Sequence, residues 1–224
     1  MIPDFHERLL ESGIIVPTMM TDLPLFPLAT VLFPGGLLTL QVFEVRYLDM
    51  IGACQASDRP FGVVALASGH EVRRAGAAPE QLCEVGTLAA IEHCERPQPG
   101  LMLLSCRGVQ RFRLHQPHCL PHGLWQASAE LLADDARIAI PADLRHTSDR
   151  LRQVLHEIRQ RHPGVAEPTE AQLADCGWVA NRWCELIPTQ LATKQQLMSL
   201  QSPLLRLELV TDLLDSLRPE PGNS

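Results

Sequence analysis

Residues 23–51 read LPLFPLATVLFPGGLLTLQVFEVRYLDMI, and this stretch decides the fold of the chain. Pro34 and Gly35 predict a turn, because proline fixes φ and glycine tolerates strained backbone conformations. The apolar run from Leu37 to Phe43 follows that turn and has the length and boundaries of a β-strand. The segment Arg46 to Ala56 is predicted to be a helix, because its apolar residues recur at the spacing of one helical face. These residues are Tyr47, Met50, Ile51 and Cys54.

Outward from this stretch, the first half of the chain shows strand signals as far as Asp134. Short or alternating apolar runs are separated by Pro, Gly and polar clusters, a pattern typical of β-strands. Arg107 and Gly108 are predicted to form a hairpin turn between two of these strands. The remaining predicted strands are Leu23 to Leu25, Phe61 to Ala67, Glu84 to His93, Leu101 to Cys106, Val109 to His115 and Leu124 to Leu132.

The second half of the chain is predicted to be helical, because its apolar period changes to about 3.6 residues. Thr169 and Gln172 have the T-x-x-Q spacing of a capping box, in which each residue satisfies backbone donors at a helix start. Ser202 followed by Pro203 is typical of another helix start. The predicted helices run from Asp143 to Arg161, from Thr169 to Ile187, in a short piece after Gln190, and from Ser202 to Leu217. The fold class is therefore α+β.

The composition is that of an ordinary soluble globular protein. The 224 residues are 46% hydrophobic and 20% charged, and no apolar run is long enough to cross a bilayer. The first twenty residues mix charges into apolar positions and lack the uninterrupted apolar stretch of a secretory signal. Seven cysteines without a CxxC pair predict reduced core thiols. We expect a cytoplasmic protein with no cofactor and no membrane contact.

The stretch from Leu23 to Ile51 resembles the opening signature of the N-terminal, substrate-binding domain of Lon proteases. The shared pattern is L-P-L-F-P-L, then V-L-F-P-G, then L-x-L-x-x-F-E-x-R-Y. Three further blocks, at 61–64, 86–91 and 108–113, are similar to family blocks in the expected order. The helical half is similar to the remainder of that domain more diffusely.

The resemblance implies a PUA-like β pseudo-barrel at residues 23–134, followed by a helical bundle at residues 142–218. It also implies a non-catalytic module that binds polypeptides, in protein quality control or as a protease adaptor. Its expected partners are unfolded or degron-bearing polypeptides and an ATP-dependent protease. Residues 1–22 form an N-terminal extension, in which either Met19 or Met20 is the true start or residues 5–14 form a helix. Residues 219–224 are expected to be a disordered tail.

The candidate polypeptide-binding residues are Phe26, Glu44, Arg46 and Tyr47. An aromatic side chain such as Phe26 suits a peptide-binding groove, and the charges of Glu44 and Arg46 could recognise charges on a ligand. The structural alternative is that the aromatic residues fill the core and that Arg46 and Glu44 satisfy each other. The second reading is the favoured one.

Metal-dependent and nucleophilic catalysis have weak support in the sequence. The segment HQPHCLPH contains a spacing that could surround a metal ion if the loop folded back on itself. Its candidate ligands are His115, His118, Cys119 and His122. The chain has no G-x-x-x-x-G-K-[ST] loop and no G-x-S-x-G elbow. A Ser-Lys dyad would require Lys194, the single lysine of the chain, so an unrecognised hydrolase is the least favoured hypothesis.

RNA binding is the principal alternative function, because PUA-like folds can bind RNA. The candidate residues are Arg107, Arg111, Phe112 and Arg113, which would combine positive charge with an aromatic stacking surface. The formal net charge of -7 argues against this function, since proteins gain affinity for nucleic acid mainly by neutralising phosphates. No heptad pattern predicts an oligomeric state.

Overall fold

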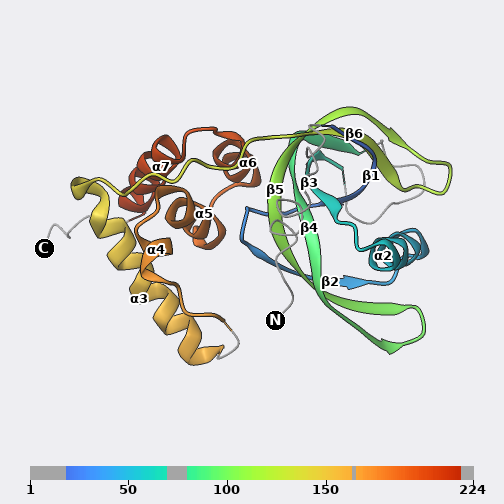
Figure 1. Cartoon of the computed structure of the whole chain (residues 1–224), viewed down its shortest axis with the longest axis horizontal. Coiled ribbons are helices and arrows are strands. Elements are labelled where there is room, and N and C mark those ends of the chain that lie inside the picture. The colour runs from blue at the N-terminus through green and yellow to red at the C-terminus, as the bar shows by residue number, and fades with distance from the viewer. Residues whose placement is uncertain (1–18, 70–79, 163–164, 218–224) are drawn as a thin grey trace, which may run out of the picture. The chain divides into compact units, whose positions relative to one another are not determined.

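The computed structural model describes residues 19–69, 80–162 and 165–217 (Figure 1). The chain forms two compact units that meet between Ala133 and Asp134. The predicted N-terminal helix at residues 5–14 and the predicted disordered tail lie outside the described residues. Within the described ranges, no helix is long and apolar enough to cross a membrane.

The first unit is built on one six-stranded sheet with the strand order β2-β5-β4-β3-β1-β6. β5 also pairs with β6, so the strands from β5 through β4, β3 and β1 to β6 form a closed ring of pairings. β1 and β3 are parallel, whereas the other strand pairs of this sheet are antiparallel. The strands are β1 (Met19–Leu28), β2 (Leu37–Val42), β3 (Phe61–Ser68), β4 (Gln81–Gln98), β5 (Leu101–Cys119) and β6 (Trp125–Leu131).

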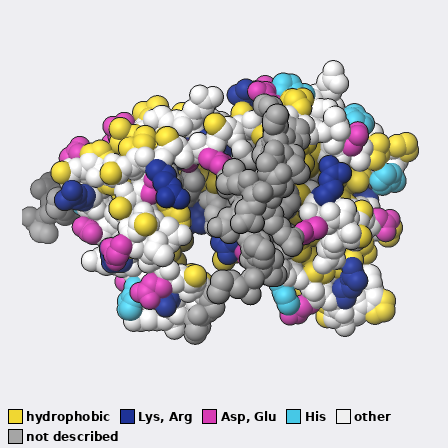
Figure 2. Space-filling model, viewed as in Figure 1, with side chains coloured by type: hydrophobic (Ala, Val, Ile, Leu, Met, Phe, Trp, Pro, Cys, Tyr) yellow, Lys and Arg dark blue, Asp and Glu magenta, His cyan; other side chains and the backbone are white. Residues whose placement is uncertain are grey.

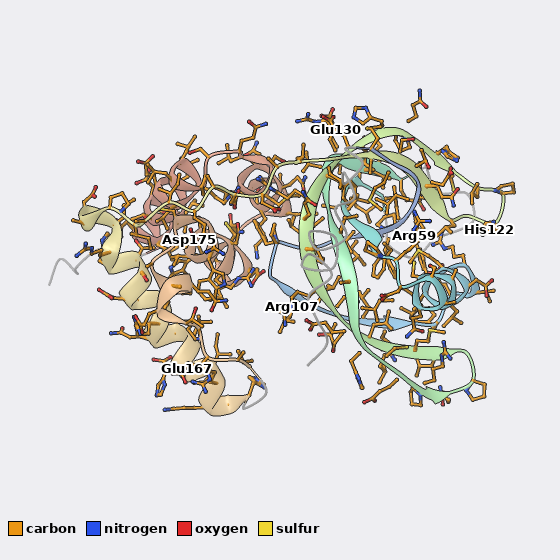
Figure 3. The ribbon with its side chains drawn as sticks, in the orientation of Figure 1. Arg59, Arg107, His122, Glu130, Glu167 and Asp175 are labelled. Atoms are coloured by element: carbon orange, nitrogen blue, oxygen red, sulfur yellow. The ribbon has the colours of Figure 1, made fainter. Side chains whose placement is uncertain are left out.

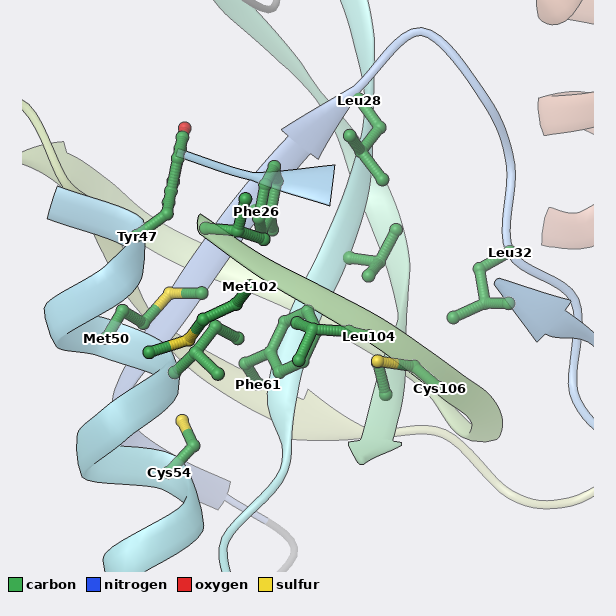
Figure 4. Packing of buried hydrophobic residues seen from close by; sticks show 14 of the residues in the cluster. Phe26, Leu28, Leu32, Tyr47, Met50, Cys54, Phe61, Met102, Leu104 and Cys106 are labelled. Atoms are coloured by element: carbon green, nitrogen blue, oxygen red, sulfur yellow. The ribbon is translucent and has the colours of Figure 1, made fainter. Parts of the chain in front are cut away.

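The helix predicted next to β2 is confirmed as α2 (Val45–Ser57). Its buried side chains are the four that the sequence pattern placed on one face: Tyr47, Met50, Ile51 and Cys54. They pack with residues of β1, β3 and β5, including Phe26, Phe61 and Met102, in one hydrophobic cluster (Figure 4). A second cluster surrounds Phe112, which is fully buried.

The predicted hairpin turn at Arg107 and Gly108 is wrong, because β5 runs through both residues. The turn lies instead between β4 and β5, where Gly100 has a φ of 79°. Gly108 is required for another reason: a Cβ atom built on it would lie 2.3 Å from the carbonyl oxygen of Phe33. Gly108 also exchanges backbone hydrogen bonds with the Pro-Gly-Gly loop, donating to Gly36 and accepting from Gly35. Gly108, which was predicted to form a turn, is therefore the point at which the backbone of β5 closely approaches the Pro-Gly-Gly loop.

The second unit is helical, as predicted, but the segment from Thr169 to Ile187 is two helices. The helices are η1 (Ala142–Leu144), α3 (Arg145–Arg161), α4 (Glu170–Leu173), α5 (Cys176–Leu186), α6 (Leu191–Ser199) and α7 (Pro203–Ser216). Asp175 interrupts the predicted helix, because its carboxylate accepts from the backbone N–H of Trp178 and so caps the start of α5. The capping box of Thr169 and Gln172 is confirmed.

Arg206 of α7 is the central polar residue of this unit. Its side chain is 1% exposed and forms an ion pair with Asp135, at the start of the unit. The same guanidinium donates to the Asn181 side chain and to the backbone carbonyls of Leu197 and Leu200. One buried cation thus connects the entering chain, α5, α6 and the loop before α7.

Candidate functional site

Three of the four candidate polypeptide-binding residues, Phe26, Tyr47 and Arg46, form one stack beside the junction between β2 and α2, and the fourth, Glu44, pairs with Arg46. The rings of Phe26 and Tyr47 lie parallel, with their centroids 4.0 Å apart. The guanidinium of Arg46 lies 4.5 Å from the centroid of the Tyr47 ring. Arg46 also donates to Glu44 at 3.0 Å and to the carbonyl oxygen of Gly123 at 2.7 Å. The structure therefore brings all four residues together, but Phe26 and Tyr47 are buried.

The environment of Tyr47 opposes ionisation of its hydroxyl group. Burial raises the pKa of Tyr47 to about 12, and the adjacent charge of Arg46 only partly offsets that effect. Removing a phenol from water disfavours the charged phenolate. This hydroxyl is therefore a neutral, structural group and is poorly suited to act as a base.

Tyr47 is the single tyrosine of the chain, so its ionisation can be followed directly. We expect tyrosinate absorbance to appear with a midpoint near pH 12 in the native protein. Because the pKa of an exposed tyrosine is about 10, this burial contributes about 3 kcal/mol of stability below pH 10. That contribution is lost as the pH rises toward 12. Tyr47→Phe supplies the background absorbance, and a midpoint near 10 with native circular dichroism would contradict the prediction.

The exposed side of the same junction is apolar, a feature that the sequence analysis did not identify. Phe43 is 58% exposed, Val45 is 71% exposed, and Leu103 of β5 is 37% exposed. Leu103 pairs with Gln41, two residues before Phe43, so the outward side chains of β2 and β5 lie on one face. We call Phe43, Val45 and Leu103 the junction surface. In sequence, Phe43 and Val45 alternate with Glu44 and Arg46, which form an ion pair with each other.

The arginine candidates for RNA binding are not presented on one surface. Phe112 is fully buried and Arg111 is 4% exposed, whereas Arg107 and Arg113 are exposed. Arg107 is engaged by Glu92 on β4 and by the carbonyl oxygen of Gly35. On the face seen in Figure 2, the Lys and Arg side chains are separated by acidic, apolar and other groups. Because Phe112 and Arg111 are buried, neither side chain is presented to a base or a phosphate of RNA.

The histidine-rich segment is part of the β5–β6 hairpin and not a separate loop. His115 contacts the Glu130 carboxylate at 3.0 Å, whereas the His118 ring contacts the Gln116 carbonyl oxygen. His122 lies at the end of the hairpin, well away from Glu130 (Figure 3). Within the described ranges, no group of three or more His, Cys, Asp or Glu side chains could hold a metal ion. The weak metal candidates therefore do not converge.

Neither the buried cysteines nor Lys194 is in an environment that favours nucleophilic catalysis. Burial raises the pKa of the Cys106 and Cys184 thiols to about 12, which disfavours the reactive thiolate. Lys194 donates to the backbone carbonyl of Glu185, at the end of α5. These contacts give no pairing of nucleophile and base.

The family model and the solved structures that resemble this chain all indicate the same protein family. Residues 22–216 match the family model of the substrate-binding domain of the ATP-dependent protease La (Lon). The chain resembles the solved Lon N-terminal domain protein from Xanthomonas campestris with a TM-score of 0.68 and 27% sequence identity. That likeness covers 89% of this chain and 100% of the other. The N-terminal domain of Mycobacterium avium complex Lon protease, at 18% identity and a TM-score of 0.56, shares the fold.

Curated relatives include proteins much longer than the matched region. Protein cereblon of Danio rerio is 30% identical over 135 residues, which are 58% of this chain and 29% of cereblon. Lon protease 4 of Sorangium cellulosum is 34% identical over 47% of this chain and 12% of its own length. Lon protease of Desulfosudis oleivorans is 23% identical over 86% of this chain and 23% of its own length. The chain thus spans less than a third of each of these relatives.

Proposed function

Because the chain belongs to the family of substrate-binding domains of the ATP-dependent protease Lon, we propose that it is a non-catalytic module that binds unfolded or degron-bearing polypeptides. The family match over residues 22–216 is the observation that supports this proposal. It acts in the cytoplasm, in protein quality control, and presents bound polypeptides to an ATP-dependent protease. The seven free cysteines are compatible with that reducing compartment.

The fold assignment within this proposal is a PUA-like pseudo-barrel for the first unit and a helical bundle for the second. The closed ring of strand pairings supports the former, because closure leaves the ring strands paired on both sides over part of their length. The proposed boundaries are residues 23–134 and 142–218.

The junction surface is the proposed contact for apolar side chains of the bound polypeptide. Phe43 directly follows the buried Val42, and Val45 lies two residues before the buried Tyr47, so both exposed groups adjoin residues anchored in the core. Aromatic side chains at such positions supply much of the energy in protein interfaces. Glu44 and Arg46 form an ion pair with each other, so their charges are not the proposed recognition groups.

A binding assay with an unfolded protein tests the proposal. The intact chain is expected to bind reduced, carboxymethylated α-lactalbumin and not the native form of that protein. The double substitution Phe43→Ser and Val45→Ser should weaken binding on the order of tenfold, because it removes exposed apolar contacts without opening the core. Fluorescence anisotropy of the labelled unfolded protein gives the affinities.

The matched control is Leu209→Ser, which changes an exposed leucine of α7 in the other unit. This variant should bind like the parent chain. If the parent chain does not bind the unfolded protein at any concentration up to its solubility, the proposed function is wrong. Equal losses of affinity in the double variant and in Leu209→Ser would show that the junction surface is not the binding site.

A further inference from the structure

β2 has one edge that pairs with β5 and another edge that pairs with no strand among the described residues. The hydrogen bond from Gly108 N–H to the Gly36 carbonyl fixes which residues face each way. Antiparallel pairs alternate, so Leu38, Leu40 and Val42 direct their backbone polar groups to β5. The N–H and C=O groups that point to the free edge are those of Leu37, Thr39 and Gln41.

This edge lacks the features that normally prevent a free strand from pairing with other chains. Charged side chains, prolines and bulges usually protect an exposed edge. The sequence from Ala29 to Phe43 contains no charged residue, and β2 pairs with β5 without a register shift. The side chains of Leu37, Thr39 and Gln41, which lie on one face of β2, are exposed.

A second stretch of free edge in the same sheet, at the end of β4, has the protective features that β2 lacks. The end of β4, from Ala90 to Gln98, pairs with β5, whereas the pairing of β4 with β3 ends at Ala89. This stretch has two register shifts relative to β5. It contains the protective residues Glu92, Glu95, Arg96 and Pro97. The fold therefore protects one free edge and leaves the other uncharged.

We propose that the free edge of β2 binds an extended segment of a client polypeptide by adding it to the sheet as a further strand. This inference rests on the proposed function and names the binding mode. The only partner that complements a row of backbone N–H and C=O groups is another extended backbone. Recognition through the backbone tolerates many sequences, which suits a module for unfolded chains.

The surroundings of β2 define which side chains the added segment carries. Alternate residues of a strand point to opposite faces of the sheet. On the inner face, Leu38 and Leu40 are half-buried against the hydrophobic cluster around α2, so neighbouring apolar side chains would extend that cluster. On the outer face, the segment would approach Phe43 at the end of β2. The preferred client segment is therefore uncharged and apolar at alternate positions.

Amide hydrogen exchange measured by NMR tests the binding mode. The probe is a synthetic peptide of alternating valine and threonine, flanked by lysines for solubility. At saturation, the amides of Leu37, Thr39 and Gln41 should exchange at least about tenfold more slowly, since they become hydrogen-bonded. The amides of Glu92 and Glu95, on the protected edge of β4, should be unchanged. The same peptide with N-methylated alternate residues should lose its affinity.

Two variants separate the backbone contribution from the side chain. Thr39→Pro removes one outward N–H and is compatible with an edge position. It should weaken peptide binding at least about tenfold, whereas Thr39→Val, which keeps the N–H, should bind within about twofold of the parent. Circular dichroism and the thermal midpoint confirm that both variants are folded.

The outcomes distinguish this inference from the proposed function. Binding of peptide and unfolded α-lactalbumin without protection at Leu37, Thr39 and Gln41 would overturn the edge proposal and leave the function intact. Failure of both ligands to bind would overturn both. Protection that appears without peptide and increases with protein concentration would assign the edge to a second copy of this chain and overturn the client proposal.

Discussion

Replacing Asp135 by alanine is expected to destabilise the helical unit by about 3–5 kcal/mol, because it leaves the buried Arg206 cation without its anionic partner. The desolvated guanidinium would keep its bonds to Asn181 and two carbonyls, but these groups carry no compensating charge. Hydrogen exchange followed by mass spectrometry should show faster exchange in α5, α6 and α7. Asp135→Asn should have a smaller effect, since the amide retains one acceptor oxygen.

Asp212→Ala is the control for this prediction, because Asp212 is exposed on α7, the same helix as Arg206. It should change the stability by less than about 0.5 kcal/mol. Exchange rates in Asp135→Ala that match those of the control would show that the Arg206 network contributes little to holding the helices together.

Replacing Phe112 by alanine is expected to destabilise the β unit by about 3–5 kcal/mol, the usual range for a buried aromatic residue. Phe112 is fully buried and lies at the centre of the second hydrophobic cluster. A Cβ atom on Gly62 would lie 2.8 Å from the end of its ring, and one on Gly86 would lie 2.6 Å from it. The ring thus occupies space that two glycines leave open. Urea unfolding monitored by circular dichroism measures the change in the free energy of unfolding.

Gly62→Ala in the Phe112→Ala background sharpens the prediction. In the parent chain the added methyl group would meet the side chains of Leu25, Phe112 and Leu23, and removal of the ring eliminates one of these three close contacts. The double variant should therefore be at least about 1 kcal/mol more stable than the sum of the single effects. Phe43→Ala, the same change at an exposed phenylalanine, should have little effect on unfolding. Strict additivity would mean that Phe112 and Gly62 are not coupled.

The main elements of the fold are predictable from local pattern, because short-range periodicity and capping determine them. The buried face of α2 and the capping box at Thr169 are both confirmed. The extent of β5 is not predictable in this way, since the strand continues through Arg107 and Gly108 only because Phe33 and Gly36 approach from a distant part of the chain. Asp175 splits the predicted helix because its carboxylate has backbone donors on two segments to satisfy.

Residue type alone does not predict how exposed the candidate site residues are. Phe26 and Tyr47 were considered for ligand contact because aromatic residues favour interfaces, yet they stack on each other in the core. The exposure of Phe43 is not obvious from the sequence, because this residue ends the apolar run from Leu37 that reads as a strand. The alternation of Phe43 with Val42 is the available signal, since neighbouring residues of an extended chain point to opposite faces.

The pairing of β1 with β6 has a consequence for how the chain is made. Leu23 pairs with Ala127, 104 residues later (127 minus 23), so β1 is synthesised well before the strand with which it pairs. Such distant pairing slows folding, because a long loop must close before the contact forms. During synthesis the ring is open and the apolar strands are unprotected against aggregation. A module that we propose to hold unfolded chains thus passes through a stage at which it resembles its own clients.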